Sequence, residues 1–324
     1  MKTITASMIL AALTLAGGAT PLRAQTPAHR IGVLTPGLTY GPVFEGLREG
    51  LAKSGHVEGK DIGFVVEDTR GDVQSFPALA AKLVQAKPDL IVSVATAPGM
   101  AVGRATQTIP LVFTVVSDPV QAGLVTSYAS SQNNVTGVSS YNSPLSGKRL
   151  EILKDMAPRI KNVLTIVAVK EASAQAALPY MTDAAKRLQI HLLRRDVVNH
   201  EEVTSLLADQ WAGKVDAVFH VPSVLVTAHI EPIIVKAMKE RLPLIVYDDA
   251  NVEMGALASY GGNFRLFGIQ AAKLAAKILK GAKPADLPIE TPENLILKIN
   301  LATAKAIGLK IPPAVLERAE KLVE

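Results

Sequence analysis

The 324-residue chain contains no cysteine, few aromatic residues and no long apolar run after its first residues. Without cysteine it has no disulfide framework and no thiol for lipid attachment, and a structural zinc site would lack its usual thiolate ligands. An aromatic content of 4% argues against a surface on which bases or sugars stack. The formal net charge of +5 is too small to indicate nucleic acid as a partner.

Catalytic motifs are missing as well. The chain has neither a Gly-x-Ser-x-Gly elbow nor a His-Glu-x-x-His helix, and its six histidines show no short ligand spacing. Residues 32–39 have the glycine spacing of a phosphate-binding loop, but Leu38 stands where that loop needs a lysine. We therefore expect no enzyme, no metal and no cofactor. His220 is either a cleft residue or a hydrogen-bonded, partly buried histidine.

The first 24 residues have the layout of a secretory signal peptide: Lys2, an apolar stretch over 4–16 and a small-residue end at Ala24. A membrane anchor needs about 20 apolar residues. This stretch is shorter, and Gly17-Gly18 and Pro21 follow it. We predict cleavage after Ala24 and a soluble periplasmic protein that is not a lipoprotein.

Short apolar runs alternate with helical patterns along the rest of the chain, which predicts right-handed βαβ units and parallel sheets. The expected strands are 30–36, 62–66, 90–94 and 111–116, then 163–169, 190–194, 217–220 and 244–247. The expected helices are 41–54, 75–85, 98–106, 145–156, 172–188, 203–211, 226–241 and 264–280. The second series repeats the layout of the first, so we expect two α/β lobes.

One element occurs twice. Pro110 and Pro243 each precede an apolar run that ends in an acidic tip, Ser117-Asp118 in the first copy and Tyr247-Asp248-Asp249 in the second. An apolar run bounded by turn residues is typical of a strand buried on both faces. In parallel α/β sheets, ligands bind outside the carboxyl ends of the strands. Two lobes with facing tips therefore predict a cleft for a small molecule.

Three segments are expected to cross between the lobes: 132–141, 256–262 and 283–288. The predicted first lobe is 30–138 with 262–284, and the second is 139–261 with 285–324. Linkers of this kind absorb the dihedral changes of hinge bending.

Several passages carry a family likeness: 109–113 (IPLVF), 117–120 (SDPV), 134–139 (NVTGVS), 255–261 (GALASYG), 284–288 (PADLP) and 299–309 (INLATAKAIGL). In order and spacing they resemble the substrate-binding proteins of ABC importers of the tryptophan/tyrosine type. The likeness covers essentially the whole chain after the signal. It implies the type I periplasmic binding protein fold, with two Rossmann-like lobes, parallel sheets and a three-stranded hinge.

The resemblance also implies that strand-tip loops of both lobes close around a small ligand (an amino acid, an aromatic acid or another small carboxylate) and deliver it to a membrane permease driven by a separate ATPase. The implied first-lobe contacts are Gly37, Leu38, Thr39, Ala95, Thr96, Ala97, Ser117 and Asp118. The implied second-lobe contacts are Ser139, Ser140, Lys170, Glu171, Pro222, Ser223, Tyr247, Asp248 and Asp249. We expect a monomer.

The second lobe departs from the family pattern. Relatives commonly carry an acid directly after the proline that corresponds to Pro222, suited to an amino-acid ammonium, whereas Ser223 follows here. The loop Lys170-Glu171 also replaces an Asn-Pro pair that is often seen. The departure argues against an α-amino acid, unless Asp248 or Asp249 supplies the charge.

Some of these residues have two interpretations. Thr96 at a helix start either binds an acidic group of the ligand, together with neighbouring backbone amides, or caps its own helix. Asp118 and Asp248 either face the ligand or form turns. Tyr40 and Tyr247 either cover an apolar ligand part or pack in the core.

Three other functions remain to be weighed. A binding protein that feeds a membrane receptor instead of a permease would have the same sequence features. Repressors of the lac type reuse the two-lobe fold, but the predicted signal peptide occupies the place of their DNA-reading helix-turn-helix. A secreted α/β enzyme would need a catalytic constellation, and the sequence shows none.

Overall fold

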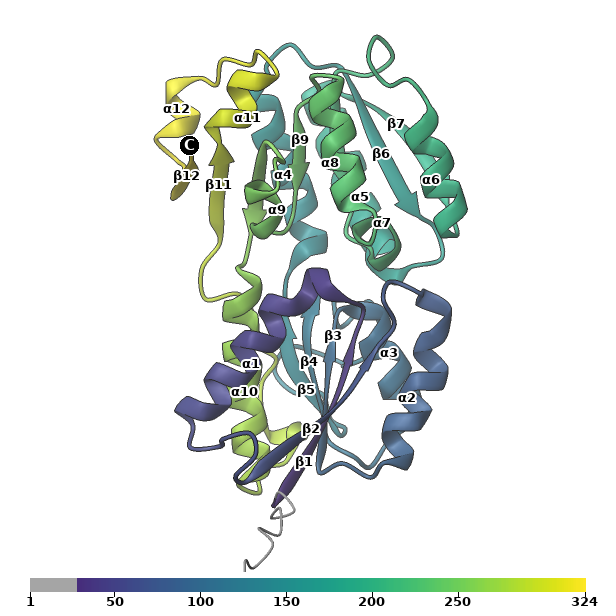
Figure 1. The fold of residues 1–324 in the computed structure, drawn as a ribbon, viewed down its shortest axis with the longest axis vertical. Coiled ribbons are helices and arrows are strands. Elements are labelled where there is room, and N and C mark those ends of the chain that lie inside the picture. The colour runs from purple at the N-terminus through teal and green to yellow at the C-terminus, as the bar shows by residue number, and fades with distance from the viewer. Residues whose placement is uncertain (1–27) are drawn as a thin grey trace, which may run out of the picture.

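The computed structural model describes residues 28–324, and the predicted signal peptide lies outside this range. The described chain forms two α/β lobes, one above the other in Figure 1, with helices on both faces of each sheet. The predicted fold class is confirmed. No helix within residues 28–324 combines the length and the apolar character that a membrane crossing requires.

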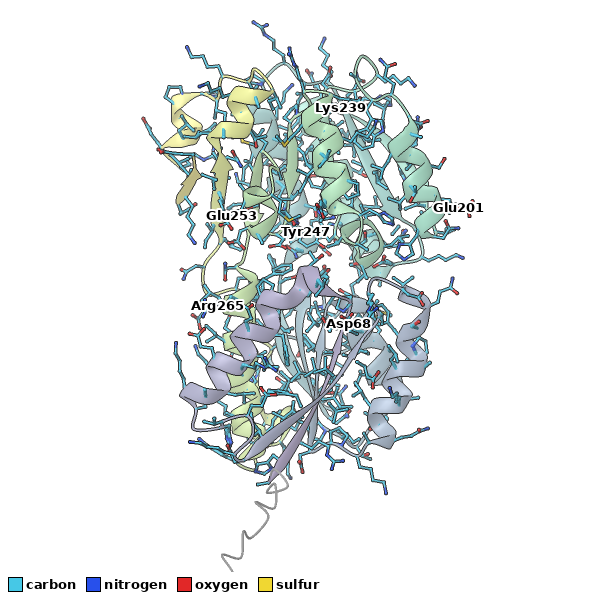
Figure 2. All side chains as sticks on the ribbon, viewed as in Figure 1. Asp68, Glu201, Lys239, Tyr247, Glu253 and Arg265 are labelled. Carbon is cyan, nitrogen blue, oxygen red and sulfur yellow. The ribbon has the colours of Figure 1, made fainter. Side chains whose placement is uncertain are left out.

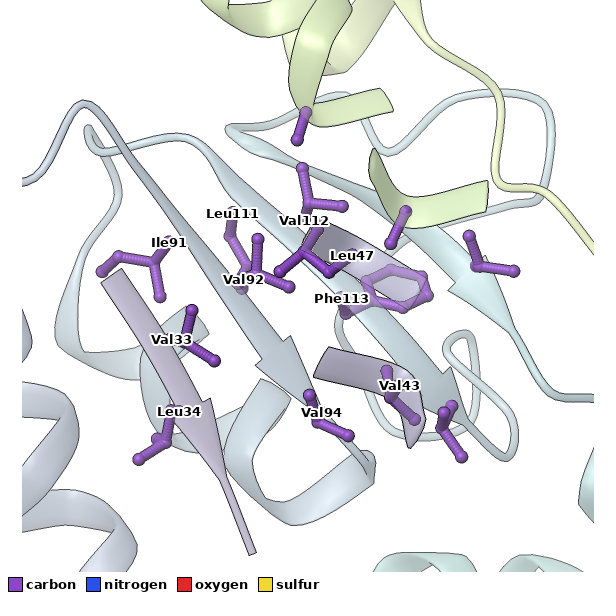
Figure 3. Packing of buried hydrophobic residues seen from close by; sticks show 14 of the residues in the cluster. Val33, Leu34, Val43, Leu47, Ile91, Val92, Val94, Leu111, Val112 and Phe113 are labelled. Atoms are coloured by element: carbon purple, nitrogen blue, oxygen red, sulfur yellow. The ribbon is translucent and has the colours of Figure 1, made fainter. Parts of the chain in front are cut away.

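The first lobe is built on five parallel strands in the order β2-β1-β3-β4-β5. All residues of β3 and β4 are buried because helices cover both faces of the sheet. Figure 3 shows part of this core, including Val92, Val112 and Phe113. Its elements are β1 (His29–Thr35), η1 (Leu38–Tyr40), α1 (Gly41–Lys53), β2 (Ile62–Asp68), η2 (Val73–Ser75), α2 (Phe76–Gln85), β3 (Leu90–Val94), α3 (Thr96–Ala105), β4 (Leu111–Val116) and β5 (Val135–Ser139).

The helix α10 (Phe264–Leu279) packs along α1 in the first lobe, although it follows most of the second lobe in sequence (Figure 1). The two backbones nearly touch. A Cβ atom added at Gly46 would lie 2.0 Å from the carbonyl oxygen of Arg265, and one added at Gly268 would lie 2.0 Å from that of Val43. Glycine at these two positions is therefore what allows α10 to dock on the first lobe.

The second lobe is built on seven strands in the order β12-β11-β10-β9-β8-β6-β7, in which β10 and β11 run antiparallel. Its elements are α4 (Asn142–Met156), β6 (Asn162–Ala168), α5 (Ala172–Leu188), β7 (His191–Val197), α6 (His200–Ala208), β8 (Ala217–His220), α7 (Val224–Thr227), α8 (Ile230–Lys239), β9 (Leu244–Val246), α9 (Ala250–Glu253), β10 (Ala258–Gly261), β11 (Ile296–Asn300), α11 (Leu301–Ala306), α12 (Pro313–Leu316) and β12 (Lys321–Val323).

The chain passes between the lobes after β5, after β10 and after Glu290. The third passage lies later than the expected segment 283–288. The short helix η3 (Pro284–Asp286) contacts β5, the Ser139 N–H donates to the Glu290 carbonyl at 2.8 Å, and the Glu290 N–H donates to the Gly137 carbonyl at 2.9 Å. Residues up to 290 thus stay with the first lobe, so the boundary expected at residue 285 lies after Glu290.

The eight expected core strands are all present, with ends that shift by a few residues. The expected helix 226–241 is instead two helices, α7 and α8, separated by Ala228 and His229. At this break the first lobe comes close, since a Cβ added at Gly71 would lie 2.7 Å from the Ala228 Cβ. The elements from β11 to β12 were not among the expected ones.

Candidate functional site

A cavity lies between the lobes, where the strand ends of the two sheets face each other. Figure 2 places Tyr247 at this junction. The first lobe contributes Tyr40, Ala95, Thr96, Val115 and Ser117, and the second contributes Asn142, Ser173, Pro222, Ser223, Val224 and Tyr247. The lining contains hydroxyl and amide groups but no charged side chain, so the cavity is polar and neutral.

Backbone strain is concentrated at the first-lobe wall. Ala95 and Val115 have φ angles of 76° and 57°, in the left-handed region that a β-branched residue such as valine rarely adopts. Val115 lies where the pairing of β4 with β5 shifts register, between Thr114 and Val116. Each strained residue costs about 1–3 kcal/mol. The ends of the two central strands of this lobe are thus held in an unfavourable conformation at the cavity.

The helix α3 opens directly onto the cavity. Ala95, at its N-cap position, offers no side-chain hydrogen bond to the first turn. Thr96 does not cap the helix either, because its Oγ1 accepts from the Ser117 N–H at 3.1 Å. The Thr96 hydroxyl proton is left to donate. Unpaired first-turn N–H groups and the helix dipole favour an anion at such a terminus.

The short helix α7 of the second lobe, by contrast, has its N-terminus already occupied. Ser223 Oγ accepts from the Val226 N–H at 3.2 Å. The two carboxylate oxygens of Glu171 accept from the Val224 and Leu225 N–H groups at 2.7 and 2.8 Å. Burial raises the pKa of Glu171, and these N–H groups oppose the rise. The Ser223 hydroxyl lines the cavity with its proton free to donate, while Glu171 serves as a cap outside the cavity.

Asn142 brings an amide donor from the second lobe. Its Oδ1 accepts from Nη2 of Arg149, which leaves Nδ2 to face the cavity. Arg149 is fully buried, and burial lowers its pKa to about 9, so it stays protonated at neutral pH. No carboxylate of residues 28–324 forms an ion pair with it. The neighbouring guanidinium polarises the Asn142 amide and strengthens it as a donor.

A neutral hydrogen-bond network joins the lobes across the cavity. The hydroxyls of Tyr40 and Tyr247 lie 3.4 Å apart, and Thr227 Oγ1 lies 2.6 Å from the Tyr247 hydroxyl and 3.2 Å from Nε2 of His220. Burial lowers the pKa of His220 to about 3 and raises that of Tyr247 to about 12. His220 stacks behind Tyr247 with ring centroids 4.7 Å apart and is the buried, hydrogen-bonded histidine of the second interpretation.

The cavity lining includes six of the residues predicted as ligand contacts: Ala95, Thr96, Ser117, Pro222, Ser223 and Tyr247. The other predicted contacts lie outside it: Gly37, Leu38, Thr39, Ala97, Asp118, Ser139, Ser140, Lys170, Glu171, Asp248 and Asp249. Leu38 begins the turn η1, which leaves its side chain 92% exposed and brings Tyr40 to the cavity in its place. Gly37 and Thr39 belong to the same turn.

Hydrogen bonds formed away from the cavity explain why most of the other predicted contacts do not line it. Asp118 Oδ1 accepts from two backbone N–H groups that follow it in its own turn. Ser139 Oγ donates to the Val116 carbonyl at 3.1 Å. The buried Ser140 hydroxyl has no partner in the described chain and does not reach the cavity. Ala97 and Lys170 lie along a wider groove beside it.

The acidic tip of the second lobe also turns away from the cavity. Asp248 Oδ1 accepts from the Ala250 N–H at 3.0 Å, and Asp249 Oδ2 accepts from Nδ2 of Asn263 at 2.8 Å. Burial raises the pKa of Asp248 to about 7. Neither carboxylate replaces, within the lining, the acid that the loop at Ser223 lacks. In the described range no group of three or more acidic or histidine side chains is placed to hold a metal ion.

Four lining residues were not predicted: Val115, Asn142, Ser173 and Val224. Asn142 carried a usable signal, since it opens a helix directly after the first crossing segment. Val115 carried none, because a bulge that turns a valine into the left-handed region leaves no trace in an apolar run.

The model of the family described as ABC transporter substrate binding protein matches residues 36–323. The chain belongs to this family. As a substrate-binding protein it binds a small molecule and is not an enzyme.

Relatives of this substrate-binding protein include the "Tyrosine-binding protein" of Clostridioides difficile (strain R20291), which is 30% identical over 82% of this chain and 76% of its own length. The structure of an ABC domain in complex with L-Trp from Streptococcus pneumoniae is 25% identical, has a TM-score of 0.82 and covers 92% of this chain and 100% of that one. The ligand-free, open structure of the Clostridium difficile protein CD0873 is 26% identical, has a TM-score of 0.65 and covers 91% of this chain and 99% of that one.

The two solved structures differ little in identity and coverage but much in TM-score. The whole substrate-binding protein therefore superimposes better on the ligand-bound structure than on the open one. Together with the Tyr40–Tyr247 contact across the cavity, this indicates that the lobes are drawn together.

Proposed function

We propose that this substrate-binding protein captures a small carboxylate between its lobes. The observation that carries the proposal is the donor set of the cavity. Thr96 and Ser223 have hydroxyl oxygens that already accept backbone N–H groups, and the Asn142 amide oxygen is bound to Arg149. Each of these groups is left to donate. A ligand group that only accepts hydrogen bonds, such as a carboxylate, complements such a lining.

The position of the cavity supports the same ligand class. The anion would sit at the uncapped start of α3, between donors from both lobes, so that binding would hold the lobes together. The names of two relatives refer to tyrosine and L-Trp, both of which are carboxylates. With no acid in the lining, an acid that lacks an α-ammonium is the better complement.

We further propose export to the periplasm and delivery to an ABC permease. The signal pattern over residues 1–24 supports export, and the family supports the permease. We propose the first lobe as 30–139 with 262–290, and the second as 140–261 with 291–324, moving about the three passages.

A thermal-shift panel tests the proposal. It would contain L-tyrosine, L-tryptophan, 3-(4-hydroxyphenyl)propionate, benzoate and the primary amide of each acid. A ligand that binds only the folded state raises the unfolding midpoint by mass action. We expect at least one acid to raise the midpoint and its amide to leave it unchanged. Equal shifts by acid and amide, or catalytic turnover of a panel member, would contradict the proposal.

A further inference from the structure

The side chain of Arg149 lies in the second lobe, beside the points where two of the three passages join it. Its Nε donates to the Tyr260 carbonyl at 2.7 Å, in β10 directly before the second passage. Its Nη1 donates to the Asn142 carbonyl at 3.0 Å, and its Nη2 donates to the Asn142 side chain, directly after the first passage. A Cβ added at Gly261 would lie 3.5 Å from Nη2, so the guanidinium fits tightly against the end of β10, where the second passage begins.

The chemistry of this guanidinium is unusual for a purely structural arginine. It is 0% exposed, its hydrogen-bond acceptors are all neutral, and no carboxylate in the described chain pairs with it. A buried charge without a counter-charge is costly to a fold, and an apolar side chain of similar volume is often the more stable choice. The planar guanidinium can donate hydrogen bonds to two separate backbone segments at once, which an apolar side chain cannot do.

The first passage is also fixed to the opposite lobe. Ser139 Oγ accepts from the Tyr141 N–H at 3.1 Å and donates to the Val116 carbonyl at 3.1 Å, beside the strained cavity residue Val115. Hydrogen bonds therefore run from the end of β4 through the first passage and Arg149 to β10. Asn142 is both a member of this chain of contacts and part of the cavity lining.

We propose that Arg149 is a positioning residue that ties together the second-lobe ends of the first two passages and orients Asn142 toward the ligand. It restricts the angles at which the lobes can open, and it fixes the Asn142 amide with its donor facing the cavity. The role of Asn142 in binding rests on the proposed function. The restraint on the hinge does not, because it would act in the ligand-free protein as well.

The absence of cysteine makes the test direct. Gln85→Cys on α2 and Glu201→Cys on α6 place two spin labels on exposed positions of the two lobes, on the same side of the molecule (Figure 1). Electron-electron resonance then gives the distribution of interlobe distances. Arg149→Met removes the charge and the fork. Arg149→Lys keeps the charge but cannot bind both passages, and it remains available if the methionine variant fails to fold. Arg187→Lys, on the surface of α5, is the matched control.

We expect Arg149→Lys and Arg149→Met to broaden the ligand-free distribution toward longer distances, while Arg187→Lys matches the parent. In titrations with L-tyrosine and 3-(4-hydroxyphenyl)propionate, affinity for the acid that binds the parent should fall about tenfold or more in both Arg149 variants. A lower unfolding midpoint with an unchanged distance distribution would overturn the proposal and leave Arg149 a structural residue. If the parent binds neither acid, the proposed function is in question, but the ligand-free distributions still decide the role of Arg149.

Discussion

At the residue scale, the proposed carboxylate site depends most on Thr96. Its oxygen accepts from the Ser117 N–H, and its proton has no partner within the described chain and is free to donate to the ligand. Thr96→Ala removes a hydrogen bond to a charged group and should weaken carboxylate binding by about 1.5–3 kcal/mol, whereas Thr96→Ser should retain most of the affinity. Isothermal titration with an acid identified in the thermal-shift panel measures both variants.

Thr106, at the other end of α3, provides the control. Its Oγ1 accepts from the Thr108 and Ile109 N–H groups, far from the cavity lining. Thr106→Ala should lower stability and leave affinity unchanged. If Thr96→Ala binds the acid as tightly as Thr106→Ala does, the donor role assigned to Thr96 is wrong.

The buried carboxyl of Asp248 should make the stability of the folded protein depend on pH. Burial, with Asp249 and Glu253 nearby, raises its pKa to about 7, against the opposing effects of the Ala250 N–H and Lys298. An unfolded aspartate has a pKa of about 3.9. Between these values the folded protein binds a proton that the unfolded chain does not, so the stability from this carboxyl is full at acidic pH and is lost as the pH rises to about 7.

Asp248→Asn should remove this dependence. The unfolding free energy of the parent minus that of Asp248→Asn should fall as the pH rises from about 4 to about 7 and stay constant above. The measurement is urea unfolding of both proteins at several pH values. The two proteins must be compared because burial also lowers the pKa of His220 to about 3, and the stability that His220 contributes is lost as the pH falls. Subtracting the variant's unfolding free energy removes the contribution of His220, which both proteins share. A difference that does not vary with pH would show that Asp248 is ionised in the folded protein.

At the element scale, the contact of α1 with α10 holds a distant segment of the chain on the first lobe. Gly268→Ala would place a methyl group 2.0 Å from the Val43 carbonyl oxygen, where neither backbone can yield easily. Overpacking of this kind costs about 1–3 kcal/mol, and we expect that loss or more in urea unfolding. Gly41→Ala is the matched control, because a Cβ there meets nothing within 4 Å. Equal stability of the two variants would contradict the close packing.

Strands and helices with a clear local pattern of apolar residues were predictable from the sequence. The buried strands β3 and β4 appear as continuous apolar runs, and their ends led correctly to Ala95, Thr96 and Ser117 at the cavity. The break between α7 and α8 was not predictable: Gly71 of the other lobe lies close to Ala228 at this break, a contact that the local sequence pattern does not show. The strand β12 was missed because it is a three-residue edge strand with exposed side chains.

The site was predictable only in part, for a similar reason. The rule that ligands bind at strand ends selects loops, whereas hydrogen bonds decide which side chain in a loop faces inward. Asp248 and Asp249 each found a partner outside the cavity. Arg149 sits inside a helix that the sequence predicts, but nothing in its local pattern indicates that it is buried at the hinge.

At the scale of the whole molecule, the lobes meet at Gly71 and Ala228 as well as at the two tyrosines. A bulky side chain at Ala228 should keep the lobes apart. Ala228→Trp is expected to weaken binding of the acid by about tenfold or more, since closure is part of binding, with little change in ligand-free stability. Titration calorimetry measures the affinity. Ala302→Trp, exposed on α11 of the second lobe, is the control. An Ala228→Trp affinity equal to that of the control would show that closure at this contact is not required.

The central claim is that this substrate-binding protein closes around a carboxylate held by neutral donors. Its most direct test is the calorimetric titration of one acid from the panel against the primary amide of the same acid. The account predicts measurable binding of the acid and at least about a tenfold loss for the amide, because the amide nitrogen brings a donor to a lining that offers donors. Equal affinity for acid and amide would contradict the account.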